Sequence, residues 1–128
     1  MKHLETFEAA CEVVGIDSKN VPNVENLPTM HAKAIVSAYM LFVISEASWK
    51  QKNEKVDWNN FDQRKYYPWF DLETYSSGSA PGFSSRGYDY GLSSSAVGSR
   101  LVFPDRESAE YVSKMHLHLY KDLMLIEE

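Results

Sequence analysis

The start of the chain carries apolar side chains at the spacing of one helical face. Intervals of three, four and three residues separate Leu4, Phe7, Cys11 and Val14, the pattern of an amphipathic helix. Gly15 follows where a left-handed C-terminal cap commonly ends a helix. We therefore predict a helix over residues 3–14. No neighbour in sequence would lower the pKa of Cys11, so we interpret it as a core residue rather than a reactive thiol.

A longer helical pattern covers residues 28–52, and its middle is apolar nearly all round. A helix without a polar face is normally enclosed by other elements, so we predict that this helix is the buried centre of the fold. Its longest apolar run, residues 34–44, is shorter than the roughly 20 residues that cross a bilayer. The pattern becomes polar towards residue 52, and Trp49 is expected to close the base of the core.

Alternating side chains replace the helical spacing at residues 65–73 and predict a strand. Pro68 donates no backbone hydrogen bond, so this strand is expected to lie at a sheet edge or to be bulged. Similar patterns predict strands over residues 83–92 and 97–103. Five of the six glycines fall between residues 78 and 98, as expected for tight turns or bulges.

The last part of the chain predicts one helix over residues 106–126, with Asp105 as its N-cap. Consecutive strands with short links favour an antiparallel sheet with helices on one face. We therefore predict a single α+β domain over residues 1–128. Its small antiparallel three-stranded sheet (65–73, 83–92, 97–103) would pack against helices 3–14, 28–52 and 106–126.

Composition excludes some classes of protein. The net charge of −5 argues against non-specific binding to nucleic acid, whose phosphates demand a basic surface. The single cysteine excludes a disulfide within the chain. The N-terminal residues carry acids and no apolar core of a secretory signal, so we expect a protein of the cytoplasm.

Candidate catalytic chemistry is sparse. The glycines do not have nucleotide-loop spacing, and there is no serine elbow. His116 and His118 are two residues apart, so on a helix their rings diverge by about 200° rather than share a metal. We expect His116 to be half-buried and hydrogen-bonded on the apolar stripe. We predict no catalytic, cofactor-binding or metal-ligating residue and no enzyme activity, although an acid–base pair remains open among Asp57, Asp62, Asp71, Asp89 and Asp105.

Aromatic residues are concentrated in the middle of the chain: ten of the 17 lie between residues 58 and 90. Such a cluster is either core or contact surface, because aromatic side chains dominate both. A stacking platform for single-stranded nucleic acid is a third interpretation, which requires Arg64 and Lys65 beside exposed rings. As a protein-binding surface, the candidate residues are Tyr66, Tyr67, Trp69, Phe70, Arg86 and Tyr88.

Two arginines lie in Ser/Gly-rich segments, Arg86 after Ser84 and Ser85 and Arg100 after Gly98 and Ser99. Backbone amides in such segments bind anions together with an arginine. Pairing of each arginine with a carboxylate is the interpretation that we favour.

Part of the chain resembles a known group of proteins. The resemblance is carried by Lys65-Tyr66-Tyr67-Pro68-Trp69-Phe70-Asp71, by Gly98-Ser99-Arg100-Leu101-Val102-Phe103, by Glu107-Ser108-Ala109-Glu110-Tyr111 and by Leu119-Tyr120-Lys121-Asp122. These strings are similar to small proteins encoded by phages and integrated mobile elements of gut anaerobes, over about residues 49–124. The group has no known activity, so the resemblance implies no functional residue. It implies a genetic setting, that of a phage or mobile-element product acting in the cytoplasm of the host cell or in a virion.

These observations lead to one expected function and one alternative. We expect a non-enzymatic interaction or structural-accessory protein of phage or prophage origin, with a protein partner or a second copy of itself, no cofactor and no membrane association. The alternative is a single-stranded nucleic-acid-binding accessory protein that uses the aromatic segment 64–70.

Overall fold

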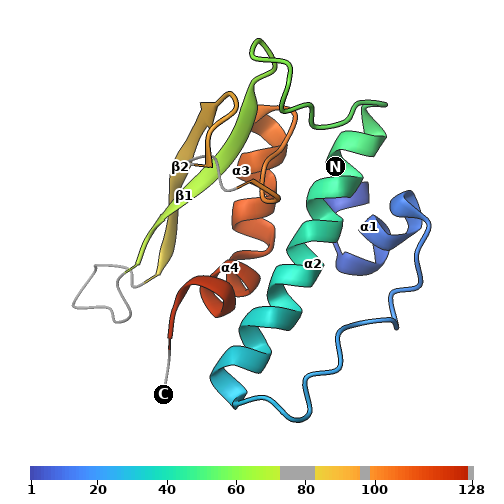
Figure 1. Ribbon diagram of the computed structural model, residues 1–128, viewed down its shortest axis with the longest axis vertical. Helices are drawn as coiled ribbons and strands as arrows, with labels where there is room; N and C mark the ends of the chain where they lie inside the picture. Colours follow the sequence, from blue (N-terminus) through green and yellow to red (C-terminus); the bar gives the residue numbers. More distant parts are fainter. Residues whose placement is uncertain (73–82, 96–98, 127–128) are drawn as a thin grey trace.

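The computed structural model describes residues 1–72, 83–95 and 99–126 and shows an α+β fold (Figure 1). In chain order the elements are η1 (Lys2–Leu4), α1 (Phe7–Val14), α2 (Thr29–Gln51), β1 (Lys65–Asp71), β2 (Ser84–Gly91), α3 (Arg106–Met115) and α4 (Leu117–Met124). The layers run from the sheet through α3 and α4 to α2, with α1 on the far side of α2 (Figure 1).

The first helix is confirmed, but it begins later than predicted. Thr6 accepts a hydrogen bond from the Ala9 amide at 3.0 Å and so caps α1, which leaves Lys2–Leu4 as a separate 3₁₀ turn. Gly15 ends α1 in the left-handed conformation, with φ of 86°. Cys11 is 1% exposed, and burial raises the pKa of its thiol, in agreement with a core role.

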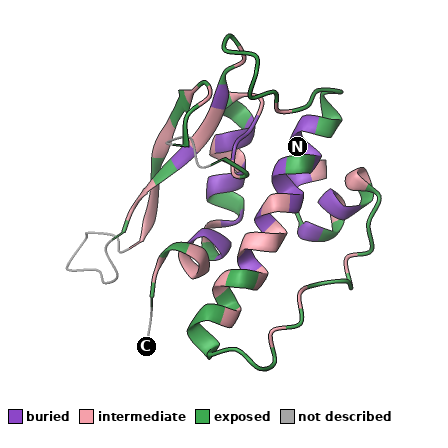
Figure 2. Ribbon diagram, viewed as in Figure 1, coloured by how far each residue is buried: buried purple, intermediate pink, exposed green. Residues whose placement is uncertain are grey.

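Helix α2 is enclosed on some sides and not all round. Leu41 and Ile44 are fully buried in the core, whereas Ile35 on another side is 42% exposed. The reason is that α1 and α4 cover only part of its circumference. Figure 2 shows buried and exposed residues alternating along α2. Within the described residues, no helix combines the length and the hydropathy needed to cross a membrane.

The predicted third strand is wrong for the residues that are described. β1 and β2 form a two-stranded antiparallel sheet, and residues 99–103 contribute a single bridge in which Phe103 exchanges two backbone hydrogen bonds with Tyr66. Residue 68 presents its nitrogen to the same edge as residue 66. Because that residue is Pro68, it has no N–H with which to continue the ladder. Residue 73 of the first predicted strand and residues 97 and 98 of the third lie outside the described residues.

The predicted last helix is divided in two at His116. Asp105 caps α3 as expected, accepting from the Ser108 amide at 2.7 Å. His116 leaves the helical conformation (φ −115°, ψ 32°) and begins α4. Its ring is 5% exposed, and Nε2 lies 2.7 Å from the carbonyl oxygen of Leu4. The prediction of a hydrogen-bonded histidine is confirmed, with deeper burial than expected.

The core lies where the sheet, the helices and η1 meet. Its fully buried side chains include Leu4, Phe103, Val112 and Tyr120. A second, smaller cluster forms where Trp49 packs with Val102, and Val56 and Tyr67 lie against it. Trp49 is therefore buried as predicted, although in this satellite cluster rather than in the main core.

Candidate interaction surfaces

The six predicted contact residues do not form one surface. Tyr66, Phe70 and Tyr88 lie on the sheet face that packs against the main core. The ring of Phe70 is 4.7 Å from that of Tyr120, centroid to centroid, and the rings of Tyr66 and Tyr88 are 6.1 Å apart. These three aromatics serve mainly to attach the sheet to the helices.

The other three residues lie on the outer face of the sheet in different surroundings. Tyr67 packs against the Trp49 cluster. Trp69 is 48% exposed and lies over Gly87, where an added Cβ would come within 3.4 Å of the indole nitrogen. Arg86 pairs with Asp71, Nε to Oδ2, at 3.0 Å, which confirms the predicted carboxylate pairing. Only Trp69 and Arg86 are left as exposed members of the predicted surface.

The groups that a nucleic-acid platform would need are also separated. Lys65 is fully buried. Arg64 stacks over the ring of Tyr90 at 4.6 Å, and Tyr90 is the cross-strand partner of Tyr66, so it shares the inner face of the sheet. Tyr67 lies on the opposite face, away from this cation. Lys65 shares the face of Tyr67 but is buried, so neither basic group is exposed beside Tyr67 and Trp69.

A different pair of aromatic residues is presented to solvent by the loop of residues 57–63, which connects α2 to β1. Trp58 is 40% exposed and Phe61 is 67% exposed. We call these two side chains the aromatic tip. Asp and Asn residues in this segment are typical of turns, but sequence patterning gives no sign of which aromatics in a loop face solvent.

Side chains of the loop hold its backbone through local hydrogen bonds. Asp57 accepts from the Asn59 amide at 2.9 Å, and Asn60 accepts from the Asp62 amide at 3.0 Å. Gln63 bridges the two ends of the loop, because it accepts from the Asp57 amide and donates to the carbonyl of residue 55, both at 2.8 Å. Asp and Asn side chains commonly fix turns in this way. The aromatic tip therefore stands on a loop with a defined conformation.

The ammonium group of Lys65 lies beneath the same loop. It donates to the carbonyl oxygens of Gln63 at 3.1 Å and Asn60 at 3.4 Å, and it lies 5.1 Å from the ring of Trp58. A buried cation requires such partners to offset its lost hydration. Ser93, which follows β2 in the chain, also donates a hydrogen bond to the carbonyl of Trp58 at 2.9 Å. Hydrogen bonds from Lys65 and from Ser93 therefore both hold the loop in place.

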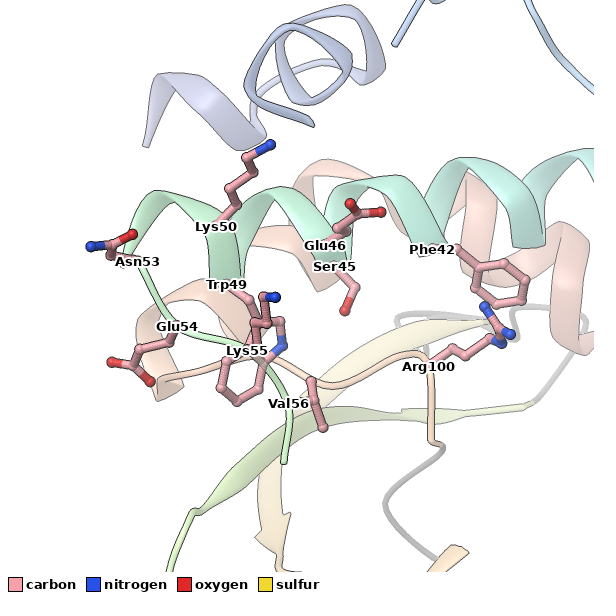
Figure 3. Close-up of a pocket in the computed structure, with 10 residues that line it drawn as sticks. All are labelled: Phe42, Ser45, Glu46, Trp49, Lys50, Asn53, Glu54, Lys55, Val56 and Arg100. Atoms are coloured by element: carbon pink, nitrogen blue, oxygen red, sulfur yellow. The ribbon is translucent and has the colours of Figure 1, made fainter. Parts of the chain in front are cut away.

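A groove of about 550 Å³ lies along the C-terminal half of α2 (Figure 3). Phe42, Trp49 and Val56 supply its apolar lining, and the remaining lining residues are polar or charged. Two buried hydrogen bonds to the carbonyl of Val102 fix one wall, from Trp49 Nε1 at 2.9 Å and from Ser45 Oγ at 2.6 Å. We call this cavity the α2 groove. Its lining comes from three separate segments, so no local sequence signal pointed to it.

The α2 groove carries cations that lack a carboxylate partner. Arg100 lies over the ring of Phe42 at 5.4 Å, and neither Arg100 nor Lys55 forms an ion pair with any residue that the structure describes. The expected pairing of Arg100 with a carboxylate is therefore not seen there. Lys50 points towards α1 and donates to the carbonyl of Val14 at 3.3 Å (Figure 3). Glu46 and Glu54 complete the charged lining.

The scattered aspartates include two with structural partners. Asp71 pairs with Arg86, and Asp105 pairs with Lys52 at 2.5 Å. Burial raises the pKa of Asp105, but hydrogen bonds from Lys52 and Ser108 outweigh it and leave the pKa below its ordinary value. Over residues 1–72, 83–95 and 99–126, no three His, Cys, Asp or Glu side chains are grouped to hold a metal ion.

Comparison with known proteins gave no matching protein family, no matching curated protein and no matching solved structure. The geometry of the chain itself therefore carries the functional inference.

Proposed function

We propose that this protein is a non-enzymatic interaction protein whose main contact surface is the aromatic tip. The observation that carries the proposal is the exposure of Trp58 and Phe61 on a loop fixed by side-chain hydrogen bonds. Large aromatic side chains supply much of the binding energy at protein interfaces. A loop already held in one conformation loses less entropy on binding. The aromatic tip combines these two properties.

The biological setting that we propose is a phage or an integrated mobile element. The support is the resemblance over residues 49–124, which includes the string Lys65–Asp71. Gene neighbourhood tests this setting. Adjacent virion-assembly genes would favour a structural accessory role, adjacent replication genes would favour a nucleic-acid-associated role, and neighbours of neither class would count against the setting.

An affinity experiment tests the contact surface. The purified protein, its Phe61→Ala variant and an Ile126→Ala control would be immobilised and exposed to an extract of the cell that carries the gene. Phe61 and Ile126 are both highly exposed, at 67% and 74%, so neither truncation should affect folding. We expect a polypeptide that wild type and the Ile126 control retain equally and that Phe61→Ala retains less or not at all. Equal retention by all three proteins would refute the role of the aromatic tip.

A further inference from the structure

We propose that the aromatic tip of one copy of this chain docks in the α2 groove of a second copy. This inference rests on the proposed function, because it names the partner of the same contact surface. The two surfaces are different, so the contact is head-to-tail, and a dimer held by one such contact still has one free tip and one free groove.

The first argument is complementarity of apolar surface. The groove has a volume within the range of about 300–1,000 Å³ that is usual for ligand sites, and it combines the aromatic side chains of Phe42 and Trp49 with Val56. The tip offers one indole and one phenyl ring, of which the phenyl ring of Phe61 is the more exposed. Burying such rings between other aromatic side chains is the typical centre of a protein interface.

The second argument is complementarity of charge. The charged side chains of loop 57–63 are Asp57 and Asp62, and neither carboxylate forms an ion pair with a residue that the structure describes. The groove has three cations without an ion pair among the described residues, and of these Lys50 is held by the carbonyl of Val14, which leaves Lys55 and Arg100. Its charged lining residues sum to +1, although the whole chain carries −5. An acidic loop with an apolar tip therefore matches a weakly basic groove with an apolar lining.

The third argument is that a chain does not fill its own groove. Neither ring of the aromatic tip lines the cavity. The ring of Trp58 is held at the Lys65 ammonium, and the turn hydrogen bonds of Asp57 and Asn60 fix the backbone that carries Phe61. A tip that reaches a groove must therefore come from another molecule.

Mixing of two variants tests this contact directly. The tip variant is Phe61→Ala, which leaves the groove intact. The groove variant is Lys55→Glu with Arg100→Glu, which reverses the two unpaired cations and leaves the aromatic tip intact. The matched control is Lys19→Glu with Lys114→Glu, which makes the same change in net charge at two exposed positions outside the groove. Circular dichroism and thermal unfolding would establish that all variants fold.

Light scattering coupled to size exclusion, and sedimentation velocity, would be measured from about 10 to several hundred micromolar. We expect the mass of wild type and of the control to rise with concentration, and each of the other variants to stay monomeric because its contact is weakened at least about tenfold. An equimolar mixture of the tip and groove variants should form a dimer and nothing larger, since only one intact contact can form. Such rescue requires a contact between two different surfaces, one supplied by each variant.

Three results would overturn the inference: a wild-type monomer at the highest concentration, assembly that survives in either variant, or a mixture that fails to dimerise. If wild type is monomeric but capture from the extract still depends on Phe61, the proposed function stands with a different partner. If capture is also insensitive to Phe61, the proposed function fails as well.

Discussion

Lys65 is the residue whose replacement tests most directly how the aromatic tip is held. Its side chain is fully buried, and its ammonium group contacts two carbonyl oxygens and one indole ring. No carboxylate among the described residues pairs with it. We predict that Lys65→Ala destabilises the protein and loosens loop 57–63, whereas Lys65→Met has a smaller effect because it keeps the apolar stem.

The expected change in the free energy of unfolding follows from two destabilising contributions and one that offsets them. Each buried methylene removed costs about 0.8 kcal/mol, and each carbonyl left without a donor costs about 1–3 kcal/mol where water cannot replace it. Relief of the desolvation of a buried ammonium offsets part of this sum. We therefore expect the free energy of unfolding to fall by about 2–4 kcal/mol in Lys65→Ala and by about 1–2 kcal/mol in Lys65→Met. Such losses are large against the 5–15 kcal/mol that is typical of whole domains.

Two assays separate global from local effects. Urea unfolding at 25 °C gives the change in the free energy of unfolding, with exposed Lys114→Ala as the control. Brief digestion with chymotrypsin, which cleaves after residues such as Trp58 and Phe61, reports the opening of the loop. Faster cleavage is expected in both Lys65 variants. An unchanged unfolding midpoint, or destabilisation without faster cleavage, would contradict the idea that Lys65 holds the loop.

The remaining predictions concern single contacts elsewhere in the fold. Burial lowers the pKa of His116 below 6.5, so the unfolded chain takes up its proton first, and stability should fall as pH drops below about 6.5. Urea midpoints across pH 4–8 should show a flatter profile for His116→Gln, with a residual slope from His3, whose pKa is also lowered by burial. Asp105→Ala removes a cap and an ion pair and should cost about 1–2 kcal/mol, more than Lys52→Ala in the same assay. Gly87→Ala introduces a side chain at φ of 149° beside the indole ring of Trp69, next to the register shift between Trp69 and Phe70. We expect a lower melting temperature, and an unchanged one would show that the backbone of β2 relaxes freely there.

The parts of the fold that were predictable have local causes. Gly15 and Asp105 end and begin helices through contacts within a few residues, so a short window of sequence contains the information. The α+β composition and the positions of β1 and β2 followed in the same way from the change in apolar spacing. The division of the last helix at His116 could not be predicted in this way, because His116 contacts the carbonyl of Leu4 at the other end of the chain.

The extent of the sheet was misjudged for a reason that the sequence contains. Residues 97–103 were predicted as a third consecutive antiparallel strand after residues 83–92, whereas the structure bridges Phe103 to Tyr66 of β1, on the strand edge that Pro68 interrupts. A bridge at Tyr66 uses the last free donor before Pro68 on that edge. The same proline therefore explains why the pairing does not extend from Phe103 back to Leu101.

The exposure of the six candidate contact residues could not be predicted from the sequence, because alternation along a strand does not say which face is covered. Tyr66 and Tyr67 are equivalent in composition, and only the tertiary packing assigns one to the main core and the other to the satellite cluster. In a loop no periodicity exists at all, so the exposure of Phe61 depends on the hydrogen bonds of its polar neighbours. The Asp and Asn residues beside Phe61 are of types that commonly form turns. A loop whose Asp, Asn and Gln side chains bond to its own backbone has little freedom left to bury an aromatic ring, so aromatics inserted among such residues are directed to solvent.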